Sequence, residues 1–423
     1  MSSTSSTSDA SPERLLPTGR SGRSLAALCA SWASWPFRRF VQRLLQGVHC
    51  GTLVVELPDG ERTEGRGALA GPLASIVLHR WRPLARLLLQ GDTGLAASYR
   101  DGDWSSSDLP ALLEFGIRNE AAWGHALDAW RPVRWLGRLL HFARRNTRRG
   151  SRENISFHYD LGNDFYALWL DPELIYSSAL HVTGDESLEE AQAHKLERIV
   201  ELLDLKSPAS VLEIGCGWGA LALALASGDG TRVTALTLSA EQLAHARGRV
   251  ADKGLEARIE LRLQDYRDVQ GSYDRIVSIE MLEAVGEHYW PTYFGTLHGR
   301  LKPGGHALVQ VITIADAHFE HYRTHTDFIQ HFIFPGGMLP CPSALKTQAD
   351  RAGLTMETVQ TFGESYALTL VEWRRRFLRA WPAIEAQGFD HAFRRLWEYY
   401  LCYCEAGFRA GRVDVGLYTL ARR

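Results

Sequence analysis

The stretch Ser210–Ala226 constrains the fold of this chain more than any other. It begins as a short aliphatic run, breaks at Gly215, Gly217 and Gly219, and continues as small residues suited to a helix. A buried strand, a glycine turn and a helix N-terminus bring the backbone close to a nucleotide in doubly wound α/β folds. The spacing Gly-x-Gly-x-Gly, preceded by Glu213, departs from the dinucleotide pattern Gly-x-Gly-x-x-Gly. It better fits the turn that holds S-adenosylmethionine (SAM) in methyltransferases, so we predict a SAM-binding domain.

The segments around this turn alternate between strand and helix patterns. The expected strands lie near Ser210–Gly215, Arg232–Leu238, Ile259–Gln264, Arg275–Ile279 and His306–Ile314, with helices between the earlier ones. A capping pattern at 187–190 opens a helix that runs to about Leu203, and a turn at 303–305 precedes the fifth strand.

Two later strands, near Met356–Thr361 and Val413–Ala421, are expected to pair antiparallel at the sheet edge. The predicted fold is α/β: a seven-stranded, Rossmann-like SAM methyltransferase sheet with a smaller N-terminal α+β domain. A helical insertion over 316–352 is expected to cap a substrate pocket.

A length of 423 residues exceeds one typical domain. We divide the chain into a disordered, then amphipathic segment (1–45), a lipid-associated α+β domain (46–130), an arginine-rich linker (131–152) and the catalytic domain (153–423). Within the second unit, a hairpin turn at Pro58-Asp-Gly60 and a helix over 84–90 opened by Pro83 are expected.

The linker carries eight arginines and no acidic residue from Arg131 to Arg152, interleaved with apolar residues at helical spacing. A charge run is usually a solvated face, but the apolar spacing favours a helix on an anionic membrane surface. No nucleic-acid motif accompanies it, so no nucleic-acid partner is expected.

No apolar run reaches the roughly 20 residues that span a bilayer. The N-terminal apolar run precedes its arginines, the reverse of a signal peptide. The six scattered cysteines show no metal-ligand spacing and suit a reducing compartment, so no metal site is predicted. We expect a cytoplasmic enzyme, peripherally associated with the inner membrane surface; the oligomeric state stays open, a homodimer included.

Candidate cofactor ligands follow successive strands, because ligands bind outside the carboxyl ends of parallel strands. Glycines let the backbone approach the methionine part of SAM, polar groups after the second strand face the ribose, and those after the third face the adenine. The candidates are Gly215, Cys216, Gly217 and Trp218 at the turn, Thr237, Leu238, Ser239 and Gln242 after the second strand, and Gln264, Asp265 and Tyr266 after the third.

Several motifs resemble the cyclopropane-fatty-acid-phospholipid synthase family, from about residue 50 to the C-terminus. They are Phe157–Tyr166, Tyr176-Ser-Ser-Ala179, Gly215–Gly219, Gln264–Asp268, Ser278-Ile-Glu-Met-Leu-Glu-Ala-Val-Gly286 and Phe334–Pro340. The related mycolic-acid cyclopropane synthases share only the second domain. The resemblance implies an enzyme that uses SAM to add a methylene carbon across a cis double bond of an unsaturated phospholipid acyl chain. It also adds Tyr176 and Ser177 to the cofactor ligands.

The chemistry restricts what such a site contains. An isolated alkene is a poor nucleophile, so the enzyme must hold it against the sulfonium methyl in a dry, apolar site. The carbocation that follows is stabilised by aromatic faces. A base must then take a proton from the new methyl group for the ring to close. The resemblance implies that a bound bicarbonate is this base, held by a glutamate, a tyrosine, a histidine and backbone groups.

The motif positions carry these roles over to Glu283, Tyr366 and the Ile312 carbonyl. Two positions depart from the family pattern: Ser178 replaces a cysteine, and Gln310 replaces the histidine. Ser178 is harmless if its backbone N–H is the ligand. Gln310 donates a hydrogen bond but takes up no proton at neutral pH. Glu280 adds a carboxylate near Glu283. Because glutamine, unlike histidine, takes up no proton, we expect a changed base or a changed product.

Cys404 matches a cysteine often given as active in this family, although the mechanism needs no thiolate and a buried structural role is the simpler interpretation. His158 and Tyr159 are expected to be scaffold or pocket lining and not catalysts. The leading function is formation of a cyclopropane acyl chain. The alternative is a methyl-branched or methylated unsaturated chain; a small-molecule methyltransferase and a degenerate lipid-binding protein are the weaker rivals.

Overall fold

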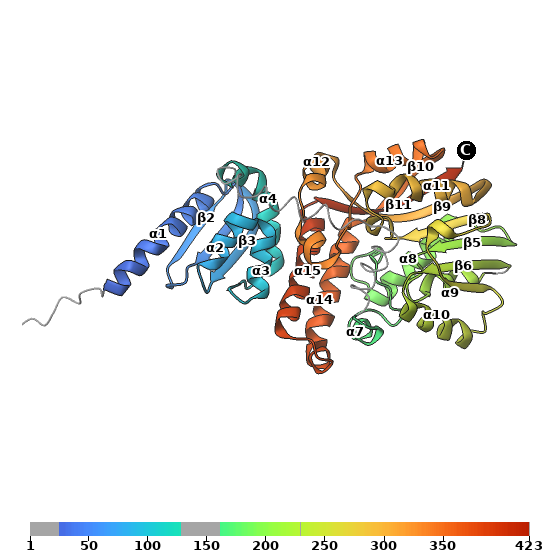
Figure 1. Ribbon diagram of the computed structural model, residues 1–423, viewed down its shortest axis with the longest axis horizontal. Helices are drawn as coiled ribbons and strands as arrows, with labels where there is room; N and C mark the ends of the chain where they lie inside the picture. Colours follow the sequence, from blue (N-terminus) through green and yellow to red (C-terminus); the bar gives the residue numbers. More distant parts are fainter. Residues whose placement is uncertain (1–24, 128–160, 229, 423) are drawn as a thin grey trace, which may run out of the picture.

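The computed structural model describes residues 25–127, 161–228 and 230–422. They form a small N-terminal unit and a larger sheet-containing unit, with a pair of long helices between them (Figure 1). The Ser/Thr-rich start, the arginine-rich linker 131–152, and His158 and Tyr159 lie outside the described residues.

The N-terminal unit is built on a four-stranded sheet in the order β2-β1-β3-β4. The strands are β1 (Cys50–Glu56), β2 (Arg62–Arg66), β3 (Leu69–Leu78) and β4 (Trp104–Ser105). The predicted hairpin joins β1 and β2, which pair antiparallel, and Gly60 in its turn has a φ of 84°. β1 also pairs with β3, in parallel, so the sheet is mixed.

Within the described residues, four helices complete this unit: α1 (Leu25–Gln46), α2 (Arg82–Gln90), α3 (Asp92–Arg100) and α4 (Leu109–Leu127). α2 has proline in its first turn as expected. α4 packs on β1 and β3, while the C-terminal half of α1 buries Val41 and Leu45 beside β2. Among the described helices, none is both long enough and apolar enough to cross a membrane.

The larger unit contains the predicted seven-stranded sheet, in the order β10-β11-β9-β8-β5-β6-β7. The strands are β5 (Ala209–Ile214), β6 (Thr231–Thr237), β7 (Ile259–Leu263), β8 (Tyr273–Ile279), β9 (Leu301–Ile314), β10 (Leu354–Thr361) and β11 (Val413–Arg422). The late strands pair antiparallel at one edge, as predicted. The expected turn at 303–305 instead lies within β9, at a register shift against β8.

Helices flank this sheet as the alternating pattern predicts. They are α7 (Asn163–Ala167), α8 (Leu188–Leu203), α9 (Ala220–Ala226), α10 (Ala240–Asp252) and α11 (Trp290–Arg300), with α12 (Asp316–Thr324) and α13 (Pro342–Arg351) in the predicted insertion. Ser187 forms the predicted capping box with Glu190 at the start of α8. Between α12 and α13, residues 329–333 form one π-helical turn.

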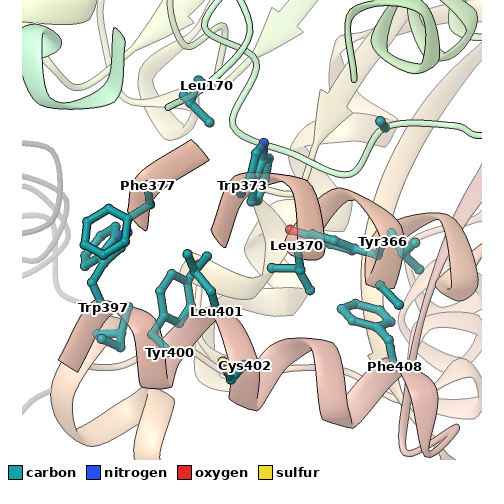
Figure 2. Packing of buried hydrophobic residues seen from close by; sticks show 14 of the residues in the cluster. Leu170, Tyr366, Leu370, Trp373, Phe377, Trp397, Tyr400, Leu401, Cys402 and Phe408 are labelled. Atoms are coloured by element: carbon teal, nitrogen blue, oxygen red, sulfur yellow. The ribbon is translucent and has the colours of Figure 1, made fainter. Parts of the chain in front are cut away.

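The helix pair α14 (Gly363–Ala386) and α15 (His391–Arg409) is absent from the sequence prediction. The two helices pack through large apolar side chains, which Figure 2 shows facing one another across the pair. Trp373 and Phe377 of α14 are almost completely buried, as are Trp397 and Leu401 of α15. The pair forms the wall between the two units (Figure 1).

The N-terminal unit is attached to α15. The Arg395 guanidinium donates hydrogen bonds to the carbonyl oxygens of Tyr99 and Trp104, and its Cζ lies 4.0 Å from the centroid of the Tyr99 ring. Tyr399 packs against Tyr99 and Trp104 beside it. Because both carbonyl oxygens belong to the N-terminal unit, α15 fixes that unit against the catalytic unit.

Candidate active site

The predicted glycine turn forms one wall of a pocket at the carboxyl end of β5. Gly215, Gly217 and Gly219 all have positive φ, which only glycine adopts at little cost. A Cβ on Gly215 would lie 3.2 Å from Cγ of Met281, whereas one on Gly217 would meet no protein atom within 4 Å. Since Gly217 lines the pocket, the space above it is open to a ligand.

This pocket has a volume of about 210 Å³, and we call it the cofactor pocket. Twelve of the thirteen predicted cofactor residues line it: Tyr176, Ser177, Gly215, Cys216, Gly217, Trp218, Thr237, Leu238, Gln242, Gln264, Asp265 and Tyr266. Ser239 does not. Its hydroxyl accepts the backbone N–H of Gln242 and caps α10 instead.

Two buried ionisable groups in the cofactor pocket, Glu213 and Lys195, are absent from the sequence-based ligand set. Glu213 is the penultimate residue of β5, and its Oε2 has no hydrogen-bond partner among the described residues. Burial raises the pKa of its carboxyl to about 8. Lys195 of α8 is almost fully buried, and its Nζ donates to Ser177 Oγ at 2.6 Å. Burial lowers the pKa of Lys195 to about 8. Lys195 stands alone in a helix, so no sequence motif marks it as part of the pocket.

Asp265, expected near the adenine, is held in place by its neighbour. Arg267 donates to both carboxylate oxygens, at 2.9 and 2.5 Å. Asp265 therefore lines the pocket in a fixed orientation.

A second cavity, of about 2140 Å³, adjoins the cofactor pocket, and we call it the apolar cavity. Glu280 and Tyr176 line both spaces, so the two meet at these side chains. Glu283, Ile312, Tyr366 and Cys404 line the apolar cavity. Ser178 and Gln310 are fully buried behind this surface. The structure thus gathers the predicted catalytic residues around one point.

Glu280, rather than Glu283, is the centre of that group. Its Oε1 accepts the Ser178 N–H at 2.9 Å and the Gln310 side-chain amide at 2.7 Å. Its Oε2 accepts the Tyr366 hydroxyl at 2.7 Å. The contact from Ser178 is through its backbone, so the missing cysteine sulfur is not required for it.

The backbone of Glu280 adopts a φ of 48°, which is uncommon for a residue other than glycine and typical of functional sites. Burial raises the pKa of the Glu280 carboxyl, although the Ser178 N–H, Lys195, Tyr366 and Gln310 oppose the shift. A carboxylate whose pKa is raised by burial and that is held in place by three donors is suited to act as a proton acceptor.

Glu283 lies beside Glu280 and bonds the backbone of β9. Its Oε1 accepts the Ile312 N–H at 2.6 Å. Its Oε2 has no partner among the described residues. Burial and the Glu280 charge raise the pKa of Glu283 to about 8. Glu283 thus presents an unsatisfied carboxyl oxygen beside Glu280.

Aromatic side chains surround the meeting point. The hydroxyls of Tyr176 and Tyr400 lie 2.9 Å apart, and the Tyr366 ring stacks on Phe408. Cys404 lines the same wall; burial raises the pKa of its thiol, which disfavours a thiolate. Such walls exclude water and stabilise a developing cation.

The residues of the cofactor pocket fit SAM. The open space above Gly217 suits the methionine part, and the buried Glu213 oxygen, which has no partner among the described residues, suits its amino group. The polar groups after β6 and β7 suit the nucleoside. Within the described ranges, no cluster of His, Cys, Asp or Glu is arranged to hold a metal ion. The sheet and its cofactor pocket define a SAM-dependent methyltransferase.

Comparisons with known proteins identify the family. Residues 146–417 match the mycolic acid cyclopropane synthetase family, and the chain belongs to this family. It is 37% identical to the tuberculostearic acid methyltransferase of Mycobacterium tuberculosis over 379 residues, covering 86% of each chain. It is also 37% identical to the cyclopropane-fatty-acyl-phospholipid synthase of Escherichia coli, covering 80% of this chain and 85% of the relative.

Solved structures agree with the fold. Mycolic acid cyclopropane synthase CmaA1, complexed with SAH and CTAB, is 30% identical with a TM-score of 0.60. The match covers 98% of that protein but 64% of this chain. The cyclopropane synthase MmaA2 of Mycobacterium tuberculosis matches to the same extent, at 31% identity. Both relatives are therefore shorter than this chain.

Proposed function

We propose that this enzyme transfers the methyl carbon of SAM to the cis double bond of an unsaturated acyl chain in a membrane phospholipid. The observation that carries the proposal is the junction of the cofactor pocket with the much larger apolar cavity at Glu280 and Tyr176. An acyl chain lying in the cavity brings a double bond to this junction. Two relatives, a tuberculostearic acid methyltransferase and a cyclopropane-fatty-acyl-phospholipid synthase, are named for action on fatty acyl chains, which supports a fatty acyl substrate.

Bound SAM would supply an electrophilic methyl group: as the alkene attacks the methyl carbon, one C–C bond forms, the C–S bond breaks with its electron pair going to sulfur, S-adenosylhomocysteine leaves, and a cation remains on the other alkene carbon. The protein's part is to align the alkene, exclude water and stabilise the cation with the surrounding tyrosine rings. A proton then leaves the new methyl group. When the C–H electrons close onto the cation, the product is a cyclopropane.

Glu280 is the base that we propose for this step. It holds the three donors that the family resemblance assigned to bicarbonate: the Ser178 N–H, the side chain at 310 and the Tyr366 hydroxyl. A carboxylate of the protein thus takes the place of the soluble anion. Bicarbonate remains the alternative base.

The same methyl transfer also leads to a methylene-bearing or methylated unsaturated chain, which is the second candidate product. If a hydride shifts from the methylated carbon to the cation first, the same proton loss gives a methylene-bearing chain. Loss of a proton from a neighbouring CH2 group gives a methylated alkene. The tuberculostearic acid methyltransferase among the relatives favours this branch. The ring, the methylene and the methylated alkene have the same mass, whereas a saturated methyl branch carries two further hydrogens from a reductant.

Purified enzyme, methyl-labelled SAM and vesicles of an unsaturated phosphatidylglycerol test the proposal. Transesterified chains are weighed by mass spectrometry before and after catalytic hydrogenation under conditions that spare the ring. A labelled chain that takes up no hydrogen is a cyclopropane; one that takes up two hydrogens is a methylated or methylene chain. Absence of label in the acyl chains contradicts the proposal.

Glu280→Gly distinguishes the two bases. Glycine accepts the φ of 48° and leaves the three donors facing an anion-sized space. If Glu280 is the base, the wild type works without bicarbonate and the variant regains activity when bicarbonate is added. A wild-type enzyme that stops in bicarbonate-free buffer identifies bicarbonate as the base.

We further propose that the enzyme acts at the cytoplasmic membrane surface, an expectation that rests on the arginine-rich segment 131–152. Loss of activity on vesicles of neutral lipid supports it, and equal activity on neutral and anionic vesicles contradicts it. The mass of the enzyme in solution, measured by analytical ultracentrifugation, tests whether it forms a homodimer.

A further inference from the structure

The apolar cavity extends beyond the catalytic unit into the N-terminal unit. There it is lined by one face of the small sheet, with Leu53, Val55 and Ile76, and by apolar side chains of α1, α2 and α4. Small-molecule pockets usually have volumes of about 300–1,000 Å³. A volume of about 2140 Å³ exceeds that range more than twofold. The cavity therefore has space for more than one chain lying at Glu280.

Glycines keep the N-terminal part of the cavity open. Gly116 and Gly124 lie inside α4, where glycine costs about 0.5–1 kcal/mol relative to alanine. Both line the cavity, and a Cβ on either would meet nothing within 4 Å. Neither has a positive φ, so the backbone does not require glycine at these positions. The glycines instead leave the cavity wide along this helix.

The cavity reaches the surface where α2 meets α3. Leu89, which is 47% exposed, lines it there. Gln90 and Thr93 add polar groups to the lining beside Leu89. Apolar surface thus continues inward from a partly polar opening.

The two parts of the cavity are held in a fixed relation. Arg395 of α15 bonds the carbonyl oxygens of Tyr99 and Trp104, on either side of the end of α3. On the catalytic side, Tyr399, Tyr400, Tyr403 and Cys404 of α15 line the same cavity. α15 is therefore at once the attachment of the N-terminal unit and a wall of the catalytic site.

We infer that the N-terminal part of the apolar cavity binds the second acyl chain of the diacyl lipid whose first chain lies at Glu280. This inference rests on the proposed function. The glycerol and its ester groups lie at the polar opening by α3, and the two chains diverge into the two parts of the cavity. The substrate class is thus a diacyl glycerolipid, in preference to a free fatty acid or a monoacyl lipid.

The test fills the N-terminal part of the cavity. Gly116→Phe places a ring in open space, and Gly116→Ala is the matched control, which adds a methyl group and favours the helix. Each protein is assayed on dioleoyl phosphatidylglycerol vesicles and on a monooleoyl lysophosphatidylglycerol. We expect Gly116→Phe to lower kcat/KM on the diacyl lipid about tenfold or more, equivalent to at least 1.4 kcal/mol, and to leave the monoacyl substrate unaffected.

Other outcomes overturn the inference. Equal loss on both substrates, with SAM binding and the unfolding temperature unchanged, places the reacting chain itself in the N-terminal part. No loss on either substrate shows that this part of the cavity is not used. If wild-type enzyme labels neither lipid, the proposed function fails instead, which separates the two results.

A photoreactive lipid provides a measurement that is independent of folding in a variant. The probe is a phosphatidylglycerol with one oleoyl chain and one saturated chain ending in a diazirine. We expect the label in peptides of α1, α2, α4 or the small sheet. Label confined to peptides of α12 to α15 contradicts the inference.

Discussion

The cofactor pocket and the apolar cavity are built in different ways. The cofactor pocket takes all its lining residues from one stretch, 174–289, and depends on backbone turns at the ends of consecutive strands. The apolar cavity draws on residues from Val41 to Val413 and depends on two domains being held together. A small polar ligand can thus be recognised by a local motif, whereas a long apolar ligand needs a space that tertiary packing encloses.

Glu280 lies where the cofactor pocket and the apolar cavity meet, so its substitution should lower the activity of the enzyme more than any other substitution below. Glu280→Gln keeps the size of the side chain but removes the base, and we expect kcat to fall by about 10²–10⁴-fold while the Kd for SAM stays unchanged. Initial rates with labelled SAM and isothermal calorimetry measure the two. Glu364→Gln, exposed on the first turn of α14, is the control. Retention of full activity would remove Glu280 from the mechanism.

Gly217→Ala should affect the cofactor pocket alone. The residue has a φ of 52°, and its added Cβ would enter the open space of the pocket. The left-handed conformation costs alanine about 1–2 kcal/mol of folding stability. Because the Cβ also occupies space that SAM would fill, we expect a SAM affinity roughly tenfold weaker, measured by calorimetry. Gly248→Ala, at an exposed position inside α10, should leave the affinity unchanged. Equal binding by both variants contradicts the assignment of the pocket to SAM.

Arg395→Met should affect the apolar cavity alone. It removes two hydrogen bonds from a charged donor, each contributing about 1.5–3 kcal/mol, and loosens the N-terminal unit. We expect the KM for lipid vesicles to rise several-fold with SAM affinity unchanged, and proteolysis between the units to become faster. Arg394→Met is the control, because Arg394 lies over Trp381 within the catalytic unit. An unchanged KM would show that the two units work independently.

The smallest expected effect is on the pH dependence of the unfolding free energy, through Glu213 in the cofactor pocket. Burial raises the pKa of Glu213 to about 8, above the ordinary value of 4.5, so the folded state keeps a proton that the unfolded state has lost. The unfolding free energy therefore falls as pH rises from about 5 to 8. Glu213→Gln should raise Tm by a few degrees at pH 8.5 and not at pH 5. Calorimetric scans of the SAM-free protein at both values measure this; a difference that is independent of pH contradicts the raised pKa.

The sequence by itself predicts the methyltransferase sheet and nearly all of the cofactor pocket. Strand periodicity and the spacing of Gly215, Gly217 and Gly219 are local properties of the sequence. The residues that follow parallel strands lie together at the carboxyl edge of the sheet, where ligands bind. Ser239 is the exception, because a serine that begins a helix looks the same in sequence whether it binds a ligand or caps the helix.

Only the tertiary structure decides which carboxylate is the centre of the site. Glu280 and Glu283 are three residues apart, and their sequence context does not show that Tyr366, Gln310 and the Ser178 N–H converge on Glu280. The same holds for the apolar cavity, whose walls come from α4 and α15, nearly 300 residues apart. Hydrophobic packing is non-directional, so a sequence pattern indicates that a face is buried but not which distant face encloses it.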